Sequence, residues 1–185
     1  MTVALVLGGA RCVYEDVEAA LALGHFDGVV ACNDIATRWP GPLAAAVSKH
    51  PERWAGWLKQ RADAGHAPPA RIFAHLEVRN ATPKALRHVT DFTEFRFPGQ
   101  TGTGSSGLFA LKVALVDLGF DRAVLCGVPI SEMAGHVTNG PVWSDAPHYR
   151  EAWTEAAPEI IGRARSMSGW TRDLLGAPTA DWIAR

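Results

Sequence analysis

Short apolar runs alternate with stretches of helical periodicity along this sequence. Val3–Leu7 is wholly apolar and ends at a pair of glycines, a pattern typical of a strand buried on both faces of a parallel sheet. Apolar residues then recur at positions 13, 17, 20 and 21, which predicts a helix that ends at Gly24. Gly28–Cys32 is a second short apolar run, so this part of the chain predicts one strand–helix–strand unit.

The middle of the chain has a weaker pattern. Residues 42–48 predict a short helix, residues 53–57 a strand and residues 58–64 a second helix. Residues 71–76 form another apolar run typical of a strand, and residues 88–92 are a weaker strand candidate. No clean period covers the residues between these last two runs.

A clear helical pattern returns at Ser106. Leucines at positions 108, 111, 115 and 118 mark one face of a helix, and Lys112 and Asp117 are expected on its wetter side. Residues 123–130 then form a strong apolar run, typical of a buried strand.

The alternation of strands and helices predicts an α/β fold. We expect a Rossmann-like three-layer sandwich with a mainly parallel sheet, formed as a single domain over residues 1–185. Two more helices are expected after the last strand, over residues 149–163 and 170–175. Residues 131–185 hold four of the seven tryptophans, and we expect them to form an irregular segment that covers the core or closes as a lid.

The composition narrows the function classes. With 18 basic and 19 acidic residues the net charge is −1, which argues against a broad nucleic-acid-binding surface. No apolar run approaches the roughly 18 residues of a membrane helix, and the first residues are typical of a strand rather than a signal peptide. The three cysteines are scattered, so we expect no disulfide framework and a reduced, cytoplasmic protein without membrane association.

Ligands of open parallel sheets bind beyond the carboxyl ends of the strands. Gly8 and Gly9 follow the first predicted strand and let the backbone pass close to a ligand, and Arg11 is a candidate phosphate contact. Asn33 and Asp34 follow the second strand, where a polar pair commonly meets a ribose or a base. An ordinary turn with a surface arginine, and a cap at Asp34, are the structural alternatives.

Residues 102–107 match G-x-G-x-x-G and lead into a predicted helix, with Glu132 placed where a ribose-binding acid would be expected. This pattern keeps a dinucleotide-binding oxidoreductase as an alternative. The preceding residues 95–100 contain Pro and Gly and make a poor buried strand, which the true fingerprint requires. Ser105, Ser106 and the helix start would suit a phosphate or carboxylate, with a simple N-capped helix as the alternative.

Histidines are natural general bases near neutral pH. His136 and His148 both fall in the loop after the strongest strand and are the candidate catalytic bases, with a solvated surface position as the alternative. The sequence has no H-E-x-x-H, D-x-D or paired Cys/His spacing, so we predict no dedicated metal site.

Three blocks, residues 3–11, 28–34 and 103–130, resemble one superfamily and cover about half of the chain. This superfamily contains the bacterial family 42 sialyltransferases and the Rossmannoid proteins related to archaeal 6-hydroxymethylpterin pyrophosphokinase. In the sialyltransferases a glycine-rich turn, an asparagine and a Thr/Ser-Ser-Gly helix start surround a cytidine nucleotide, and a histidine in a late loop acts as base. The matching positions are Gly8 and Gly9 for the turn, Asn33 for the asparagine, Ser105, Ser106 and Gly107 for the helix start, and His148 for the base.

The residues and the resemblance together predict a nucleotide-binding, glycosyltransferase-like enzyme acting on a nucleotide or nucleotide-sugar. His148, or failing that His136, would take a proton from the acceptor, while Arg11 and Tyr149 would stabilise the departing phosphate. This chemistry requires no cofactor, whereas a pyrophosphokinase-like enzyme would need magnesium, with Asp34 as its ligand.

Two further hypotheses about function stay open at this point. The protein could be a non-catalytic binder of a nucleotide or phosphate ligand, or it could be an NAD-dependent oxidoreductase. A homo-oligomer is compatible with the tryptophan-rich segment, because tryptophan is enriched at interfaces.

Overall fold

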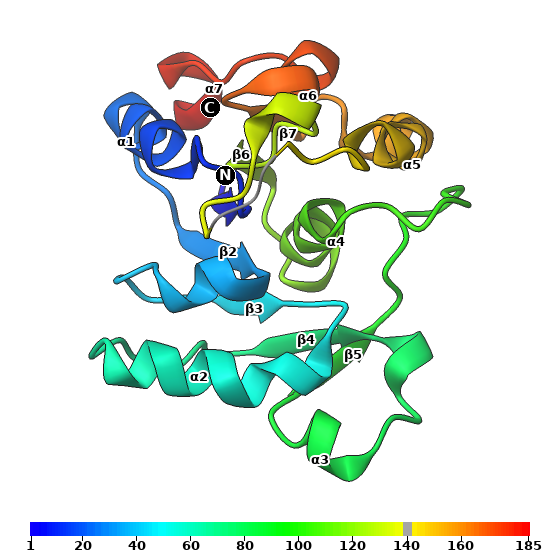
Figure 1. Cartoon of the computed structure of the whole chain (residues 1–185). Helices are drawn as coiled ribbons and strands as arrows, with labels where there is room; N and C mark the ends of the chain where they lie inside the picture. Colours follow the sequence, from blue (N-terminus) through cyan, green and yellow to red (C-terminus); the bar gives the residue numbers. More distant parts are fainter. Residues whose placement is uncertain (139–141) are drawn as a thin grey trace.

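The computed structural model describes residues 1–138 and 142–185, and its centre is a seven-stranded parallel sheet (Figure 1). The strand order is β5-β4-β3-β2-β1-β6-β7, so the chain runs outward from β1 to β5 and then returns to place β6 beside β1. The Rossmann-like fold expected from the sequence is confirmed. The strands are β1 (Val3–Leu7), β2 (Gly28–Cys32), β3 (Ala45–Val47), β4 (Ile72–His75), β5 (Asp91–Thr93), β6 (Arg122–Cys126) and β7 (Ala164–Ser166).

Helices cover both faces of this sheet and complete a three-layer sandwich, with α1 and α2 on one side and α4 and α5 on the other (Figure 1). The α-helices are α1 (Val13–Leu23), α2 (Trp54–Asp63), α3 (Pro83–Leu86), α4 (Ser106–Lys112), α5 (Ala146–Ile160), α6 (Gly169–Leu175) and α7 (Ala180–Ala184). Short helical turns are η1 (Asn33–Thr37), η2 (Pro51–Arg53), η3 (Leu76–Val78) and η5 (Glu132–Ala134), and η4 (Val113–Asp117) is a π-helical segment. No described helix is both long and apolar enough to cross a bilayer.

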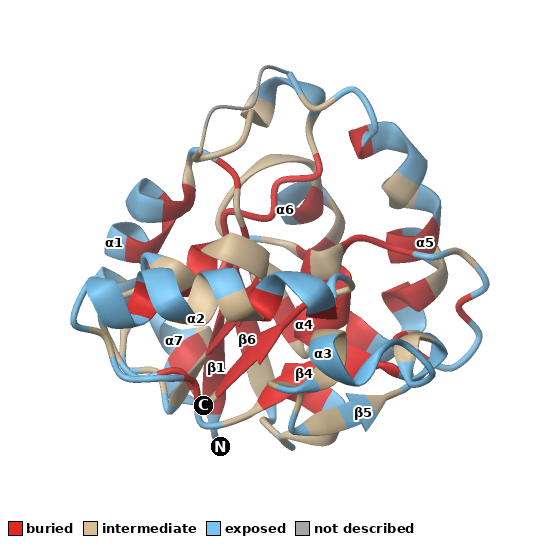
Figure 2. Ribbon diagram, turned by 60° about the horizontal axis from the view of Figure 1, so that its bottom comes forward, coloured by how far each residue is buried: buried red, intermediate tan, exposed pale blue. Residues whose placement is uncertain are grey.

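Alternation along the central strand divides the core into two layers. Val3, Leu5 and Leu7 of β1 pack toward α1 and α2, whereas Ala4 and Val6 pack toward α4 and α5. Successive strand residues point to opposite faces, so a strand covered on both sides must be apolar at every position. Buried residues accordingly fill the inner strands and the inner sides of the helices, whereas β5 at the edge of the sheet is partly exposed (Figure 2).

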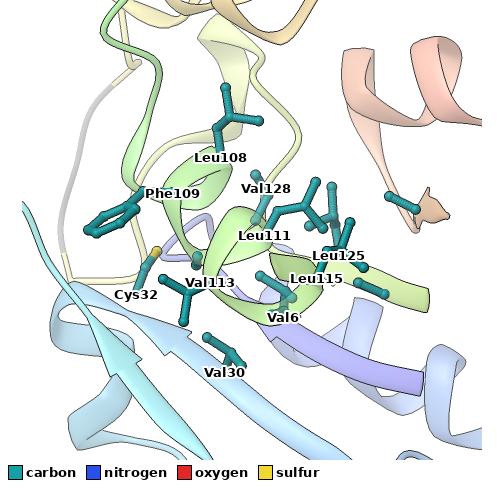
Figure 3. Close-up of a cluster of buried hydrophobic side chains, with 14 of the residues drawn as sticks. Val6, Val30, Cys32, Leu108, Phe109, Leu111, Val113, Leu115, Leu125 and Val128 are labelled. Carbon is teal, nitrogen blue, oxygen red and sulfur yellow. The ribbon is translucent and has the colours of Figure 1, made fainter. Parts of the chain in front are cut away.

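Helix α4 forms the centre of one of these layers. Its buried leucines lie over the sheet beside Val6, Val30 and Leu125, as the close-up of this cluster shows (Figure 3). Leu108 and Leu111 are at most 1% exposed, and burial of each such side chain contributes about 1.5–3 kcal/mol. The leucine pattern that predicts this helix therefore faces the core, and it anchors the end of α4 that begins at Ser106.

The expectation that Lys112 and Asp117 lie on the wetter side of this helix is wrong. Lys112 is buried, its Nζ lies 3.0 Å from Asp117 Oδ2, and it also donates to Thr93 Oγ1 at 2.6 Å. In an α-helix of 3.6 residues per turn, residues five apart point in different directions. In the π-helical segment η4, backbone hydrogen bonds join residues five apart. This brings the charges of Lys112 and Asp117 together beside Thr93 of the edge strand β5.

The elements expected in the middle of the chain also need correction. Residues 42–48 contain strand β3 rather than a helix, because their small apolar side chains fit between β2 and β4. Residues 53–57 begin helix α2 rather than a strand, with Trp54 and Arg61 buried on the same side of it. Short apolar runs of this kind have no decisive period, so only their neighbours in the fold determine their structure.

Buried Arg61 explains why α2 belongs to the core. Its guanidinium donates to the carbonyl oxygens of Ala36 and Trp39, both at 2.6 Å, and of Gly41 at 2.9 Å. These carbonyls lie in the connection between β2 and β3, which is thereby tied to α2. A fixed charge with several acceptors is the form in which a buried arginine is tolerated.

The C-terminal segment is more regular than expected. It contains α5, β7, α6 and α7, and Trp153 of α5 is fully buried. The strand β7 extends the sheet beyond β6, so this segment completes one edge of the core.

A close approach of two backbones joins the ends of β1 and β6. Gly8 N–H donates to Cys126 O at 2.8 Å, and Ala10 N–H donates to Gly127 O at 3.1 Å. A side chain at Gly8 would place its Cβ 2.3 Å from Gly127 O, so only glycine fits there. Asp16 of α1 stabilises this contact, because its buried carboxylate accepts from Gly127 N–H at 2.8 Å.

We expect Gly8→Ala to destabilise the protein by about 1–3 kcal/mol or more, because the added methyl overpacks a contact between two backbones. The measurement is the free energy of unfolding from urea titration. Gly56→Ala in α2 is the matched control, since nothing lies within 4 Å of its added Cβ. Replacing an exposed helical glycine should stabilise the protein by about 0.5–1 kcal/mol. Equal effects of the two substitutions would contradict the packing role of Gly8.

Candidate active site

A cavity of about 470 Å³ lies at the carboxyl ends of the strands, beside the turns that follow the neighbouring strands β1 and β6. This is the topological switch point at which open α/β sheets bind ligands, and the volume is in the usual range for a small-molecule site. The cavity is lined by the turns after β1, β2, β3 and β6 and by the start of α4. The predicted site residues among the lining are Gly8, Gly9, Asn33, Ser105, Ser106, Gly107, His136 and Tyr149.

The floor of the cavity is the glycine turn after β1. Gly9 lies directly beneath His136, because a Cβ on Gly9 would be 2.4 Å from Nε2 of that ring. Gly9 O also accepts from Val137 N–H at 2.8 Å, so the late loop is hydrogen-bonded onto the turn. Gly9 is therefore needed for the packing of His136 on the turn, and it also lines the cavity.

Asn33 forms the next part of the wall, at the end of β2. Its backbone has a φ of +56°, a conformation that asparagine tolerates better than most residues. Its side-chain Oδ1 accepts from Ser48 Oγ at 2.9 Å, and Ser48 Oγ in turn accepts from His50 N–H at 2.9 Å. The oxygen end of the amide is therefore held by the protein, which leaves the N–H₂ end to face other partners.

The opposite wall is the first turn of α4. Ser105 is the N-cap, with Oγ accepting from Leu108 N–H at 3.3 Å and from Trp153 Nε1–H at 3.2 Å. Ser105 is buried and committed to these bonds, so the N-capped helix considered in the sequence analysis is present. Ser106, one residue further on, is half-buried and also lines the cavity, as does Gly107.

The turn in front of α4 is occupied by a carboxylate of the protein itself. Glu155 of α5 accepts from Thr101 N–H and from Gly102 N–H, each at 2.9 Å, and from Thr101 Oγ1 at 2.5 Å. Hydrogen bonding from Thr101 Oγ1 and from these two amides lowers the pKa of Glu155. The backbone N–H groups of Thr101 and Gly102 are therefore bonded to the protein itself. The part of the glycine-rich segment that lines the cavity begins at Gly104.

The same segment does not form a dinucleotide fingerprint. Residues 94–105 connect β5 to α4 without a strand, whereas the fingerprint glycines must follow one directly. Glu132, the expected ribose-binding acid, is exposed and is not among the described lining residues. The doubtful strand at residues 95–100 is absent, with Phe95 and Phe97 buried instead as part of the core.

His136 is held between two partners above the glycine floor. Its Nε2 lies 3.5 Å from Asp34 Oδ1, and its Nδ1 lies 2.6 Å from Thr138 Oγ1 and 3.2 Å from Thr138 N. Arg11 is exposed, and its Nε donates to His136 O at 3.4 Å. Neither Asp34 nor Arg11 is among the described lining residues, and both contact His136, which does line the cavity.

The aromatic side of the cavity comes from the start of α5. Tyr149 and Trp143 both line it and stack on each other, with ring centroids 5.3 Å apart. His148, their neighbour, is exposed and is not among the described lining residues. The structure thus separates the two candidate bases, with His136 at the cavity and His148 outside it.

Backbone strain marks the loop after β6. Ile130 lines the cavity with a φ of +44°, a conformation that costs a β-branched residue about 1–3 kcal/mol. Arg150 of α5 holds it there, because its Nε and Nη2 both donate to Ile130 O at 3.3 Å. Thr171 Oγ1 donates to Val128 O at 2.5 Å on the other side. A strained backbone that is held in place by hydrogen bonds from neighbouring elements is typical of a preformed ligand site.

Two lining residues, Lys49 and His50, are not identified by the sequence pattern. They follow β3, where the pattern predicts a helix, and so it does not place them at the carboxyl end of the sheet. The sequence does contain a signal: a short apolar run followed by polar residues is the pattern that identifies Asn33 after β2.

The cavity offers no reactive thiol among the residues that line it. Cys32 is one of them, but burial and, to a lesser extent, Asp34 raise the pKa of this thiol to about 12. Nucleophilic cysteines need a lowered pKa. Within residues 1–138 and 142–185 there is no group of three or more His, Cys, Asp or Glu side chains arranged to hold a metal ion.

Solved structures with the same fold include two of sialyltransferases. A variant of the sialyltransferase Cst-II in complex with CMP has a TM-score of 0.65 and 13% identity, over 97% of this chain and 88% of that chain. CstII from Campylobacter jejuni, in complex with the substrate analogue CMP-3FNeuAc, has a TM-score of 0.59 and 13% identity, over 99% and 87% of the chains. The MAf glycosyltransferase from Magnetospirillum magneticum AMB-1 has a TM-score of 0.54 and 13% identity, over 99% and 36%.

These likenesses extend over nearly the whole of this chain, well beyond the three sequence blocks that carry the resemblance. Comparison of the sequence with protein-family models and with curated proteins gives no match. The fold shared with these solved structures is therefore shown by the structure and not by comparison of the sequence.

We expect Glu155→Gln to lower the melting temperature at pH 7, because the amide is uncharged and keeps only one acceptor oxygen for the two backbone N–H groups and the Thr101 hydroxyl. The folded-state pKa of Glu155 lies below its unfolded value, so its stabilisation is complete above the usual glutamate pKa of about 4.3. It is lost as the pH falls through the lower folded-state value.

The measurement is the melting temperature of both proteins between pH 3 and pH 7. Glu151→Gln on the exposed side of the same helix is the matched control and should follow the wild type at every pH. A difference between wild type and Glu155→Gln that persists unchanged at pH 3 would contradict the role of the ionised carboxylate.

Proposed function

We propose that this protein is a glycosyltransferase-like enzyme that binds a nucleotide-activated sugar in the cavity at the β1–β6 switch point. One observation carries the proposal: the glycine turn after β1, Asn33 after β2 and the start of α4 line the same cavity. These are the three elements that the resemblance to family 42 sialyltransferases assigns to a cytidine nucleotide. The fold shared with a sialyltransferase bound to CMP supports the same proposal.

The nucleotide would be held by groups of complementary polarity. The Asn33 oxygen accepts from Ser48, so the amide N–H₂ end is the one that would donate to a carbonyl oxygen of a pyrimidine base. Ser106 and Gly107 present a hydroxyl and backbone N–H groups at the start of a helix, which suit a phosphate oxygen. Trp143 and Tyr149 provide an apolar wall for the flat faces of the base or the sugar.

His136 is the proton acceptor that the geometry favours. It lines the cavity, and the carboxylate of Asp34, 3.5 Å from its Nε2, would stabilise the imidazolium formed after proton uptake. His148 is the alternative base, and it would require α5 to turn its exposed side chain inward.

In the proposed reaction the hydroxyl oxygen of an acceptor forms a bond to the anomeric carbon of the sugar. The bond between that carbon and the phosphate oxygen breaks, and the nucleotide leaves with the electron pair. The acceptor proton passes to Nδ1 of His136, which exchanges its contact with Thr138 Oγ1 for the acceptor hydroxyl while Asp34 stays beside Nε2. The start of α4 stabilises the negative charge on the departing phosphate, so the chain's own residues supply both the base and the leaving-group stabilisation.

We expect the wild type to release free nucleotide slowly from at least one of a CMP-, UDP- or GDP-activated sugar, with water replacing the natural acceptor. His136→Ala should reduce the rate constant about 100- to 10,000-fold, the usual contribution of a general base. The measurement is nucleotide release followed by chromatography. His148→Ala is the matched control and should retain the wild-type rate.

Two results would contradict the proposal. Release that is lost in His148→Ala but kept in His136→Ala would make His148 the base. Binding of a nucleotide without release from any of the three donors would identify a non-catalytic binder.

A further inference from the structure

Lys49 has a fixed position at the edge of the cavity where α4 begins. It follows β3 and lines the cavity beside Gly104. Its Nζ donates to Gly104 O at 3.3 Å and lies over the ring of Phe95, 5.0 Å from the centroid. The side chain is thus directed along the wall toward the first turn of α4 rather than into bulk solvent.

The charge of Lys49 is poorly compensated by the protein. Among the described lining residues it is the one lysine or arginine, and those residues include no aspartate or glutamate. Burial lowers the pKa of its ammonium, with Arg96 acting in the same direction and Glu77 opposing. Glu77 is itself paired with Arg96, whose Nη1 lies 3.2 Å from Glu77 Oε1. An anion in the cavity would relieve the cost of this half-buried cation.

We propose that Lys49 recognises an oxyanion of the ligand, either a phosphate or a carboxylate, bound between its ammonium and the first turn of α4. An ammonium group has three N–H donors, and Gly104 O occupies one of them, so two remain for the anion. The inference rests on the proposed function in one respect: a nucleotide-activated donor would supply this anion, from its phosphate or from an acidic sugar.

This role makes Lys49 a specificity-determining residue. It selects anionic ligands over the corresponding nucleoside, because a neutral molecule leaves the ammonium uncompensated. It also complements the start of α4, whose N–H groups and Ser106 hydroxyl are uncharged donors. Lys49 lies in the loop after β3 and Ser106 begins α4, so folding brings the two parts of this anion site together.

The test uses inorganic phosphate and acetate as probes, followed by the amide NMR shifts of Gly104 and Ser106 at constant ionic strength. Lys49→Met keeps an apolar chain over Phe95 and removes the charge, and we expect its phosphate affinity to fall about tenfold to a hundredfold. Lys49→Arg should restore most of the affinity. Lys84→Met, an exposed lysine on α3, removes the same charge from a residue that is not among the described lining residues and should change nothing.

Saturable binding of phosphate but not acetate would assign the site to phosphate, and binding of acetate alone would assign it to a carboxylate. Equal affinities in Lys49→Met and Lys84→Met would overturn the proposal, as would the absence of binding of either probe to the wild type. A loss of melting temperature in Lys49→Met with unchanged phosphate affinity would also overturn it, since Lys49 would then serve only to hold Gly104.

A second arm compares CMP with cytidine in the same variants. Where the first arm assigns the site to phosphate, we expect Lys49→Met to lower the affinity for CMP about tenfold or more and to leave that for cytidine unchanged. Equal losses for both would overturn the role of Lys49. Phosphate binding that depends on Lys49, in a wild type that binds none of cytidine, CMP, UDP and GDP, would contradict the proposed function and leave the anion site standing.

Discussion

The fold depends on one close approach, that of Gly8 at the end of β1 to Gly127 at the end of β6. These strands are neighbours in the sheet although they lie far apart in sequence. Because a Cβ on Gly8 would lie 2.3 Å from Gly127 O, the two turns can meet only without side chains. The carboxylate of Asp16 then fixes Gly127 N–H from within α1, and it also accepts from Ser168 Oγ at 2.7 Å. The contact thereby joins the first helix, the two central strands and the C-terminal segment.

The cavity is a consequence of this arrangement. The turns diverge above the two glycines, and the loop after β6 is held apart in a strained conformation at Ile130 by Arg150. Opposite it, Trp153 and Glu155 of α5 fix the N-cap and the approach of α4. The walls are therefore determined before any ligand enters, which is the condition under which positioned donors act most strongly on developing charge.

Much of the fold and part of the site could be predicted from the sequence. The strands β1, β2 and β6 and the helix α4 have uninterrupted apolar runs or clear periods, and the rule that ligands bind at carboxyl ends places Gly8, Asn33 and Ser106 together. The three-residue strand β3 has no such signal, so the position of Lys49 after it could not be predicted. The hydrogen bond between Thr101 and Glu155 joins residues 54 apart, so no local sequence pattern predicts it. Which of two loop histidines faces the cavity depends on how the loop packs on Gly9, a tertiary contact that spacing alone does not contain.

The central claim is that a nucleotide binds at the switch point, across the turn after β1, the end of β2 and the start of α4. It is tested most directly by titrating the uniformly ¹⁵N-labelled protein with CMP, UDP and GDP in turn and mapping the backbone amide shifts. The account predicts that the largest changes occur together at Gly9, Asn33, Ser106 and Gly107, with little change at Thr101 and Gly102, whose amides are bonded to Glu155. Saturable changes confined to another surface, or no changes with any of the three nucleotides at millimolar concentration, would contradict it.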